Sequence, residues 1–378
     1  MRRIAIAFVI LLFFPLTRLN ALTWHVPSQY PTIWEAMSVA GSGDTVLVAD
    51  GTYYATPPGA GLYHLFNNKQ NVTLISEYGK DNTILMPASD SDWMINFYMS
   101  SNCTISGFTL SNSNRFAIGT YQSSGIKILN CNIIASSREG INIDLDSGNI
   151  DIAHNMIIEN STGIKTSGHN VIISNNTISR NNLYGIDCNP GSGTTTIISN
   201  HVSENNQGGI LFGTGYNASV IVQSNIIERN ANRGLESGSL NSNLVYICNN
   251  TIAANDYGMK LYNGSPEIRG NIIANNIGPG IIAVEYSNPY ILCNDVWGNS
   301  NYANGNYVGY ITDQTGYNGN ISTDPFFCNA SVRDYSVAAN SPALLANCGA
   351  MGAITTPGCS NQTPIEQITW GAIKALYR

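Results

Sequence analysis

Five titratable side chains between residues 144 and 187 are of the types that acid and base chemistry on a sugar ring requires. They are Asp144, Asp146, Lys165, His169 and Asp187. Carboxylates beside a lysine can exchange protons with a sugar, or hold Ca²⁺ against a uronate while its C5 proton is removed. We therefore take Lys165, Asp144, Asp187 and His169 as candidate catalytic residues and Asp146 as a candidate substrate-binding residue.

An alternative to a catalytic role is that these charged side chains only stabilise the fold, because opposite charges at neighbouring positions of a sheet attract each other. The five histidines, at positions 25, 64, 154, 169 and 201, show no pair with metal-ligand spacing. We expect no resident metal or other cofactor, except that Ca²⁺ becomes a possible cofactor if the protein is a lyase.

An internal repeat supplies the elements that must position these side chains. An Asn followed two residues later by an aliphatic residue recurs every 21 to 25 residues, and a residue three places before each Asn is also aliphatic. About five residues after this anchor comes a second Asn, and then a Gly followed by Ile, Leu or Met. The anchors are Asn132, Asn155, Asn176, Asn200, Asn225, Asn250, Asn271 and Asn294.

Short β-rich runs at this period cannot bury their apolar side alone, so successive repeats must stack. Leucine-rich repeats have a similar length but need a Leu scaffold and a helical segment, which the pattern lacks. A right-handed parallel β-helix fits, with coils about 4.8 Å apart and the anchor Asn side chains in one buried, hydrogen-bonded ladder. This ladder explains why the chain has 49 Asn residues. In this register Asp187 follows Lys165 one coil on, Asp144 lies diagonally from Lys165, and Asp146 matches His169.

Three stretches make the sequence resemble the secreted bacterial right-handed β-helix proteins of the pectin-lyase-like superfamily. They are the opening segment Trp24–Tyr53, the coils Phe108–Asn299 and the closing segment Asp324–Ala353. The resemblance implies the fold and leaves lyase, hydrolase, esterase, epimerase, adhesin and binding functions open. None of three catalytic signatures of the superfamily is present: Arg-x-Pro-x-x-Arg, Gly-His-Gly and Gly-x-x-Asp-Phe-x-x-Gly.

The two ends of the chain differ from the coils. Arg2 and Arg3 precede an apolar run from Ile4 to Leu16, which is too short to span a membrane and is typical of a signal peptide. We expect a signal peptide at 1–21, a β-helix with caps at 22–359, including a capping helix near 32–40, and a tail at 360–378. We expect the mature protein to be exported to the periplasm, the cell surface or the extracellular space. We do not expect it to span a membrane.

The chain has eight cysteines, and disulfides are common in exported proteins. Cys328, Cys348 and Cys359 lie in the irregular closing segment, where a covalent link stabilises most, and we predict a bridge between Cys348 and Cys359. Cys188 has an inward register and is expected to be a buried free thiol.

The leading functional hypothesis is recognition of an extracellular or cell-surface polysaccharide. Tyrosines gather toward the C-terminal end, and flat rings with a polar edge suit sugar faces, so Tyr262, Tyr286 and Trp297 are candidate substrate-binding residues. A net charge of -7 with only 11% charged residues argues against a nucleic-acid partner. Alternatives are a polysaccharide lyase, C5-epimerase or glycoside hydrolase, and a structural surface protein or adhesin. A monomer is expected.

Overall fold

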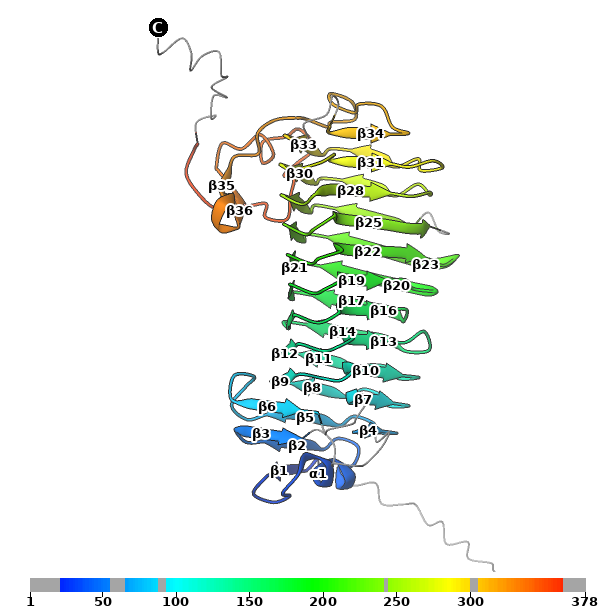
Figure 1. The fold of residues 1–378 in the computed structure, drawn as a ribbon, viewed down its shortest axis with the longest axis vertical. Helices are drawn as coiled ribbons and strands as arrows, with labels where there is room; N and C mark the ends of the chain where they lie inside the picture. Colours follow the sequence, from blue (N-terminus) through cyan, green and yellow to red (C-terminus); the bar gives the residue numbers. More distant parts are fainter. Residues whose placement is uncertain (1–20, 55–64, 88–92, 241–243, 300–304, 363–378) are drawn as a thin grey trace, which may run out of the picture.

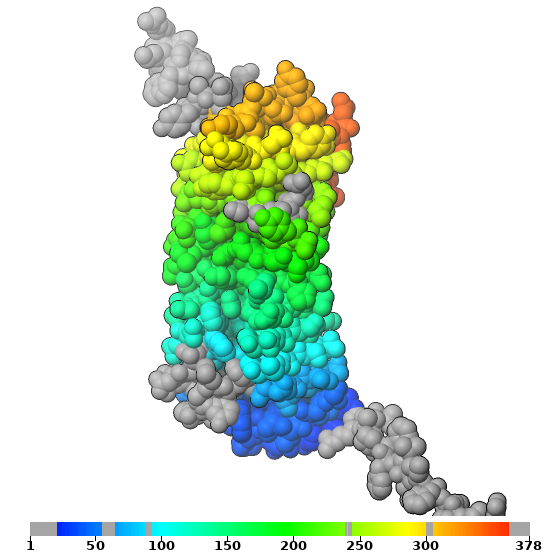
Figure 2. Space-filling view, turned by 90° about the vertical axis from the view of Figure 1, so that its right-hand side faces the viewer, coloured from blue at the N-terminus to red at the C-terminus, as the bar shows by residue number. Residues whose placement is uncertain are grey.

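The protein is an elongated stack of β-coils in the computed structural model, which describes residues 21–54, 65–87, 93–240, 244–299 and 305–362 (Figure 1). The expected signal peptide, apart from Ala21, and the tail from residue 363 lie outside these residues. In Figure 2 the colours follow the sequence along the long axis, so each coil contacts mainly the coils before and after it. The described ranges contain no helix that is long and apolar enough to cross a membrane.

Each coil contributes one strand to each of three parallel sheets, which form the faces of the stack. Sheet I has 12 strands and carries the N-terminal end of most coils. Its strands are β1 Thr23–Val26, β2 Thr45–Val48, β5 Thr73–Ser76, β8 Thr104–Ser106, β11 Lys127–Leu129, β14 Gly148–Ala153, β17 His169–Ser174, β20 Ser192–Ile198, β23 Asn217–Gln223, β26 Val245–Cys248, β29 Glu267–Arg269 and β32 Tyr290–Leu292.

Sheets II and III have 11 strands each. Sheet II consists of β3 Gly51–Tyr54, β6 Thr83–Met86, β9 Thr109–Ser111, β12 Asn132–Ile134, β15 Met156–Ile158, β18 Thr177–Ser179, β21 His201–Ser203, β24 Ile226–Glu228, β27 Thr251–Ala253, β30 Ile272–Ala274 and β33 Asp295–Trp297. Sheet III consists of β4 Phe66–Asn67, β7 Trp93–Tyr98, β10 Phe116–Tyr121, β13 Glu139–Ile143, β16 Thr162–Thr166, β19 Tyr184–Cys188, β22 Gly208–Thr214, β25 Arg233–Leu240, β28 Tyr257–Leu261, β31 Ile281–Ala283 and β34 Tyr307–Gly309.

The core is filled by columns of aliphatic side chains that repeat from coil to coil. Ile152, Ile173 and Ile197 are paired neighbours in sheet I, and all three are fully buried. The helix α1 Ile33–Val39 covers the N-terminal end of this core, as predicted, with Thr32 and Glu35 forming a capping box. Its side chains Ile33, Ala36 and Met37 are buried against the first coils.

The predicted asparagine ladder is present and lies between sheets I and II. In it each backbone N–H donates to the side-chain oxygen of the next Asn at 2.8–3.0 Å, from Asn155 through Asn176, Asn200, Asn225, Asn250, Asn271 and Asn294 to Asn320. A second ladder between sheets II and III begins at Asn160 and repeats the same bond at 2.9–3.1 Å as far as Asn299. The ladders satisfy backbone groups at the buried bends.

Asn132, however, is not a member of the ladder. Cys131 holds that position, because its backbone N–H donates to Asn155 Oδ1 at 2.9 Å, while Asn132 pairs with Met156 at the start of β12. The inward residues of this coil are accordingly Ile128 and Ile133, one place earlier than the sequence register predicts. A slip of one residue would turn the apolar side chains of the strand outward, so their burial decides the register.

A C-terminal segment, residues 324–359, folds back onto the outer face of sheet II beside the last coils (Figure 1). It contains β35 Phe327–Asn329, the 3₁₀ helix Ala330–Val332 and β36 Asp334–Val337. The carboxylate of Glu228, which is fully buried, joins this segment to the stack. Its oxygens lie 3.1 Å from His201 Nε2, 3.3 Å from Tyr335 Oη and 3.8 Å from Arg333 Nη1.

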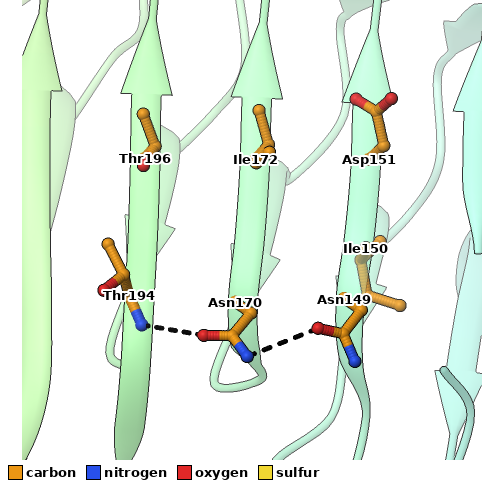
Figure 3. A pocket seen from close by; sticks show the side chains of 7 residues that line it. All are labelled: Asn149, Ile150, Asp151, Asn170, Ile172, Thr194 and Thr196. Atoms are coloured by element: carbon orange, nitrogen blue, oxygen red, sulfur yellow. Dashed lines mark hydrogen bonds between the residues drawn. The ribbon is translucent and has the colours of Figure 1, made fainter. Parts of the chain in front are cut away.

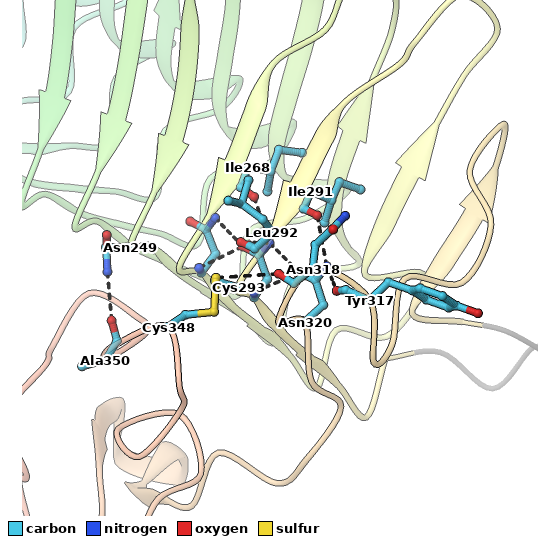
Figure 4. The surroundings of a disulfide bond; sticks show 12 residues. Asn249, Ile268, Ile291, Leu292, Cys293, Tyr317, Asn318, Asn320, Cys348 and Ala350 are labelled. Carbon is cyan, nitrogen blue, oxygen red and sulfur yellow. Dashed lines mark hydrogen bonds between the residues drawn. A yellow bond between two sulfur atoms is a disulfide. The ribbon is translucent and has the colours of Figure 1, made fainter.

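The predicted bridge between Cys348 and Cys359 is wrong. Cys348 is bonded to Cys293 of the stack, and Cys359 is bonded to Cys328 within the segment. Because the segment returns along sheet II, Cys348 meets a coil rather than its neighbour in sequence, and Figure 4 shows this link. Cys188 is a buried free thiol, as expected.

Candidate functional site

The outer face of sheet III carries a group of charged side chains, which the strand register holds in columns. The middle column contains Asn142, Lys165, Asp187, Leu211, Glu236 and Lys260, one from each successive coil. The predicted succession of Lys165 and Asp187 is therefore correct. We call Glu139, Lys165, Tyr184, Asp187, Arg233 and Glu236 the sheet III cluster.

Lys165 is the exposed cation of this cluster. Its Nζ lies 3.8 Å from Glu139 Oε1, and 46% of its side chain is exposed against 17% for Glu139. The other oxygen of Glu139, Oε2, is buried and has no hydrogen-bond partner among the described residues. A buried carboxylate oxygen without a partner is costly, so Glu139 is an energetically unfavourable member of the cluster.

Asp187 neighbours Lys165 on the next coil. Burial raises the pKa of the Asp187 carboxyl, and the Lys165 ammonium and a hydrogen bond from Asn189 Nδ2 at 2.6 Å act in the opposite direction. Burial is the larger effect, so Asp187 holds its proton to higher pH than an exposed aspartate. Perturbed carboxyl groups of this kind gather at functional sites, although structural ion pairs produce them too.

Tyr184, Glu236 and Arg233 form the second half of the cluster. Tyr184 Oη donates to Glu236 Oε2 at 2.9 Å, and Arg233 Nη1 lies 2.8 Å from the same oxygen. The Tyr184 ring reaches this position by lying over Gly208, where an added Cβ would be 2.9 Å from a ring carbon. Burial and the bond to Glu236 raise the pKa of Tyr184 to about 12, so its hydroxyl stays protonated near neutral pH and keeps donating to Glu236.

Asp144 lies on the same face but is turned toward the preceding coil. It accepts weak hydrogen bonds from Thr120 Oγ1 at 3.4 Å and from the backbone of Gln122 at 3.5 Å. The recorded ion pair of Lys165 is with Glu139 and not with Asp144. The strand register does place Asp144 diagonally from Lys165, as predicted, but no ion pair joins the two side chains.

The predicted match between Asp146 and His169 is wrong. His169 begins β17 of sheet I and pairs with Gly148, and Asp146 lies exposed in the turn before that glycine. The His169 ring covers Gly148 so closely that any side chain there would overlap it. The turns after β13 and β16 differ in length, so equal spacing from the repeat Gly does not give equal positions in sheet I.

The three aromatic candidates lie in different surroundings. Tyr262 follows β28, close to the sheet III face, with Lys260 Nζ 4.6 Å from its ring centre. Tyr286 is 81% exposed in the turn between β31 and β32. Trp297 ends β33 of sheet II and packs against the apolar cluster under the C-terminal segment. The sheet III cluster thus has at most Tyr262 near it.

The sequence register overlooked Glu139, Tyr184 and Arg233, although a signal was available. Each stands immediately before a repeat glycine, Gly140, Gly185 or Gly234. The strand pairing skips that glycine, and the residue before it and the residue two places after it both lie on the outer face. Within the described residues, no three His, Cys, Asp or Glu side chains lie close enough together to hold a metal ion.

A shallow pocket of about 350 Å³ lies on a different face, the outer side of sheet I (Figure 3). Asn170 Nδ2 donates to Asn149 Oδ1 at 3.3 Å, and Thr194 N donates to Asn170 Oδ1 at 3.2 Å. These bonds join consecutive coils. Asn149, Asn170 and Thr194 therefore form a short exposed counterpart of the buried ladders. This pocket has no charged pair comparable with those of the sheet III cluster.

Solved structures with a similar fold include two modules from Azotobacter vinelandii. The A-module of mannuronan C-5 epimerase AlgE6 is 17% identical, with a TM-score of 0.58 over 77% of this chain and 93% of that one. The AlgE4 A-module is 18% identical, with a TM-score of 0.58 over 77% and 89%. The pectate lyase Pel9A is 13% identical, with a TM-score of 0.53 over 89% and 96%. At these identities the likeness concerns the fold.

No curated protein matches the sequence. A family model described as "Right handed beta helix region" matches three overlapping ranges, 67–193, 93–249 and 166–296, which together exceed half of the chain. The ranges coincide with the coils that carry both asparagine ladders and the sheet III cluster. The chain therefore belongs to the right-handed beta helix family.

Proposed function

We propose that the protein binds a polysaccharide along the outer face of sheet III. The observation that carries the proposal is the sheet III cluster. It places hydrogen-bond donors, acceptors and one exposed ammonium on the outer face of strands that lie about 4.8 Å apart. An extended polymer lying parallel to the long axis would meet polar side chains of the cluster on β13, β16, β19 and β25, with Leu211 of β22 between the last two.

The similar structures support a uronate-containing polymer as the ligand. They are named as enzymes of mannuronan and pectate, which are polyuronates. In this chain Lys165 is half exposed and available to a uronate carboxylate. Asp187, because burial raises its pKa, donates a hydrogen bond to such a carboxylate whenever it is protonated.

The test is a binding screen of the purified protein against uronate-containing and neutral glycans. Lys165→Ala should weaken binding of the preferred uronate at least about tenfold, the scale for losing one charge-assisted contact. Lys127→Ala is the matched control, because Lys127 is an exposed lysine on sheet I. Equal affinities for wild type and Lys165→Ala would contradict the proposal that the polysaccharide binds on sheet III. Equal losses of affinity in Lys165→Ala and Lys127→Ala would contradict it too.

A second candidate function is proton transfer at C5 of a bound uronate, as in a lyase or epimerase. The observation that favours it is a carboxyl with a raised pKa beside a lysine on one open face. In this route Lys165 removes the proton and Asp187 hydrogen-bonds the substrate carboxylate. Lys165 must be neutral to accept the proton while Asp187 must be protonated to bind the substrate carboxylate, so turnover should rise and then fall as the pH increases.

This candidate is tested on any uronate that the protein binds, by following new unsaturated ends and inversion at C5. Assays with added Ca²⁺ and with a chelator test the possible cofactor. Lys165→Ala and Asp187→Asn should each reduce turnover at least about a hundredfold. Binding without turnover in the wild type would leave only the first function.

A further inference from the structure

A shallow, open polar pocket of about 620 Å³ lies at the C-terminal end of the stack, away from the sheet III cluster. It is formed by one loop that follows β34. Its walls are Thr312, Asp313, Gln314, Thr315, Tyr317 and Asn318. One side chain is an aromatic ring and the other five are hydroxyl, amide or carboxylate groups, which is the composition that saccharide pockets use.

Tyr317 provides an open ring face in this pocket. Its side chain is 68% exposed, and Figure 4 shows it pointing away from the neighbouring disulfide. The polar groups beside it are held in place by the loop itself. Asp313 Oδ1 accepts from the backbone of Thr315 at 2.9 Å, and Gln314 Nε2 donates to the carbonyl oxygen of Thr312 at 3.0 Å.

The loop is fixed to the last coil, so the pocket exists before a ligand arrives. Asn318 O accepts from the backbone N–H of Cys293 at 2.9 Å. Asn320 ends the buried ladder and donates from Nδ2 to Tyr317 O at 2.8 Å. Gly319, at φ +74°, sits against the Cys293–Cys348 disulfide, where a Cβ would overlap Cys348 Sγ. Such preorganisation lowers the entropic cost of binding.

The charge of the pocket differs from that of the sheet III cluster. Asp313 is the one charged side chain in its lining, and no lysine or arginine is among the lining residues. A uronate carboxylate would therefore meet like charge here. A neutral sugar, in contrast, can place its C–H face on Tyr317 and its hydroxyls against Asp313, Gln314 and Asn318.

From this arrangement we infer that loop 312–318 is a second saccharide site, which takes a neutral pyranose and is independent of the proposed uronate face. The two sites lie on different parts of the stack and have opposite preferences for charge. One molecule can then hold a charged polymer on its side and a neutral glycan at its end.

The experiment titrates the full protein with neutral β-1,4-linked gluco-, manno- and galacto-oligosaccharides and with oligouronates. Tyr317→Ala should weaken binding of the preferred neutral oligosaccharide at least about tenfold, because stacking on one aromatic ring is lost. Tyr317→Phe keeps the ring and should stay within about threefold of wild type. Tyr310→Ala is the matched control, since Tyr310 is 69% exposed and lies outside the pocket.

Cross-tests separate this site from the proposed function. Lys165→Ala should leave neutral-sugar binding unchanged, and Tyr317→Ala should leave uronate binding unchanged. The inference is overturned if no neutral oligosaccharide binds the wild type, or if Tyr317→Ala and Tyr310→Ala behave alike. It is also overturned if Lys165→Ala abolishes neutral binding. Failure of uronate binding alone would refute only the sheet III proposal.

Discussion

Replacing Asn200 by Leu tests the buried ladder at its centre. Asn200 Oδ1 accepts from the backbone and the side chain of Asn176, both at 3.0 Å. Its Nδ2 donates to Ile173 O at 2.8 Å, Ile198 O at 3.1 Å and Asn225 Oδ1 at 3.0 Å. The substitution removes these five bonds and leaves the buried N–H of Asn176 and the buried carbonyl of Ile173 without a side-chain partner.

Each buried polar group that loses its partner costs about 1–3 kcal/mol. The extra apolar surface of Leu offsets part of this cost, so we expect the free energy of unfolding to fall by about 2–4 kcal/mol. Urea unfolding followed by circular dichroism measures the change. Asn206→Leu is the control, because Asn206 is an exposed Asn on the same coil and should shift little.

The result that would refute the reasoning is an Asn200→Leu protein with the urea midpoint of the control. The amide bonds would then add nothing beyond the packing of the coil. An equal loss of stability in Asn206→Leu would show that Leu is tolerated poorly anywhere on this coil. The loss in Asn200→Leu could then not be attributed to the ladder bonds.

Three further outcomes are expected. Glu228→Leu should cost about 1–3 kcal/mol, since it leaves the buried hydroxyl of Tyr335 without its acceptor and removes the ion pair to Arg333, and limited proteolysis should then cut the C-terminal segment first. Burial raises the pKa of Asp295 to about 7, so the folded state binds its proton more tightly than the unfolded state, and stability falls as pH rises toward 7. Asp295→Asn should lessen that fall, measured by urea unfolding at acid and alkaline pH; an unchanged pH dependence contradicts the assignment. Burial raises the pKa of Cys188 to about 12, so native thiol labelling should miss Cys188, and rapid modification would contradict its inward register.

The repeat made the fold predictable from sequence. In a stacked solenoid each residue contacts the equivalent residue of the next coil, so the spacing of Asn155, Asn176 and Asn200 already describes tertiary contacts. The column that contains Lys165 and Asp187 was predictable for the same reason. The capping helix was equally local, because Thr32 and Glu35 define its start within four residues.

Part of the candidate site depended on bends that the repeat does not encode. The turn between sheets III and I varies in length, and the sequence therefore could not align Asp146 with its true neighbours or exclude His169. The direction of a side chain was also undetermined. Tyr184 reaches Glu236 only because Gly208 leaves room for its ring.

The sequence by itself determined the coils, because their contacts repeat at a fixed spacing along the chain. Only the tertiary structure decided what happens where that spacing ends. The C-terminal segment returns along sheet II, which pairs Cys348 with Cys293 and buries Glu228 against Arg333. These partners are 55 and 105 residues apart, and no periodic signal links them. Burial of Ile133 likewise placed Cys131, and not Asn132, in the ladder, since one strand can turn only one set of side chains inward.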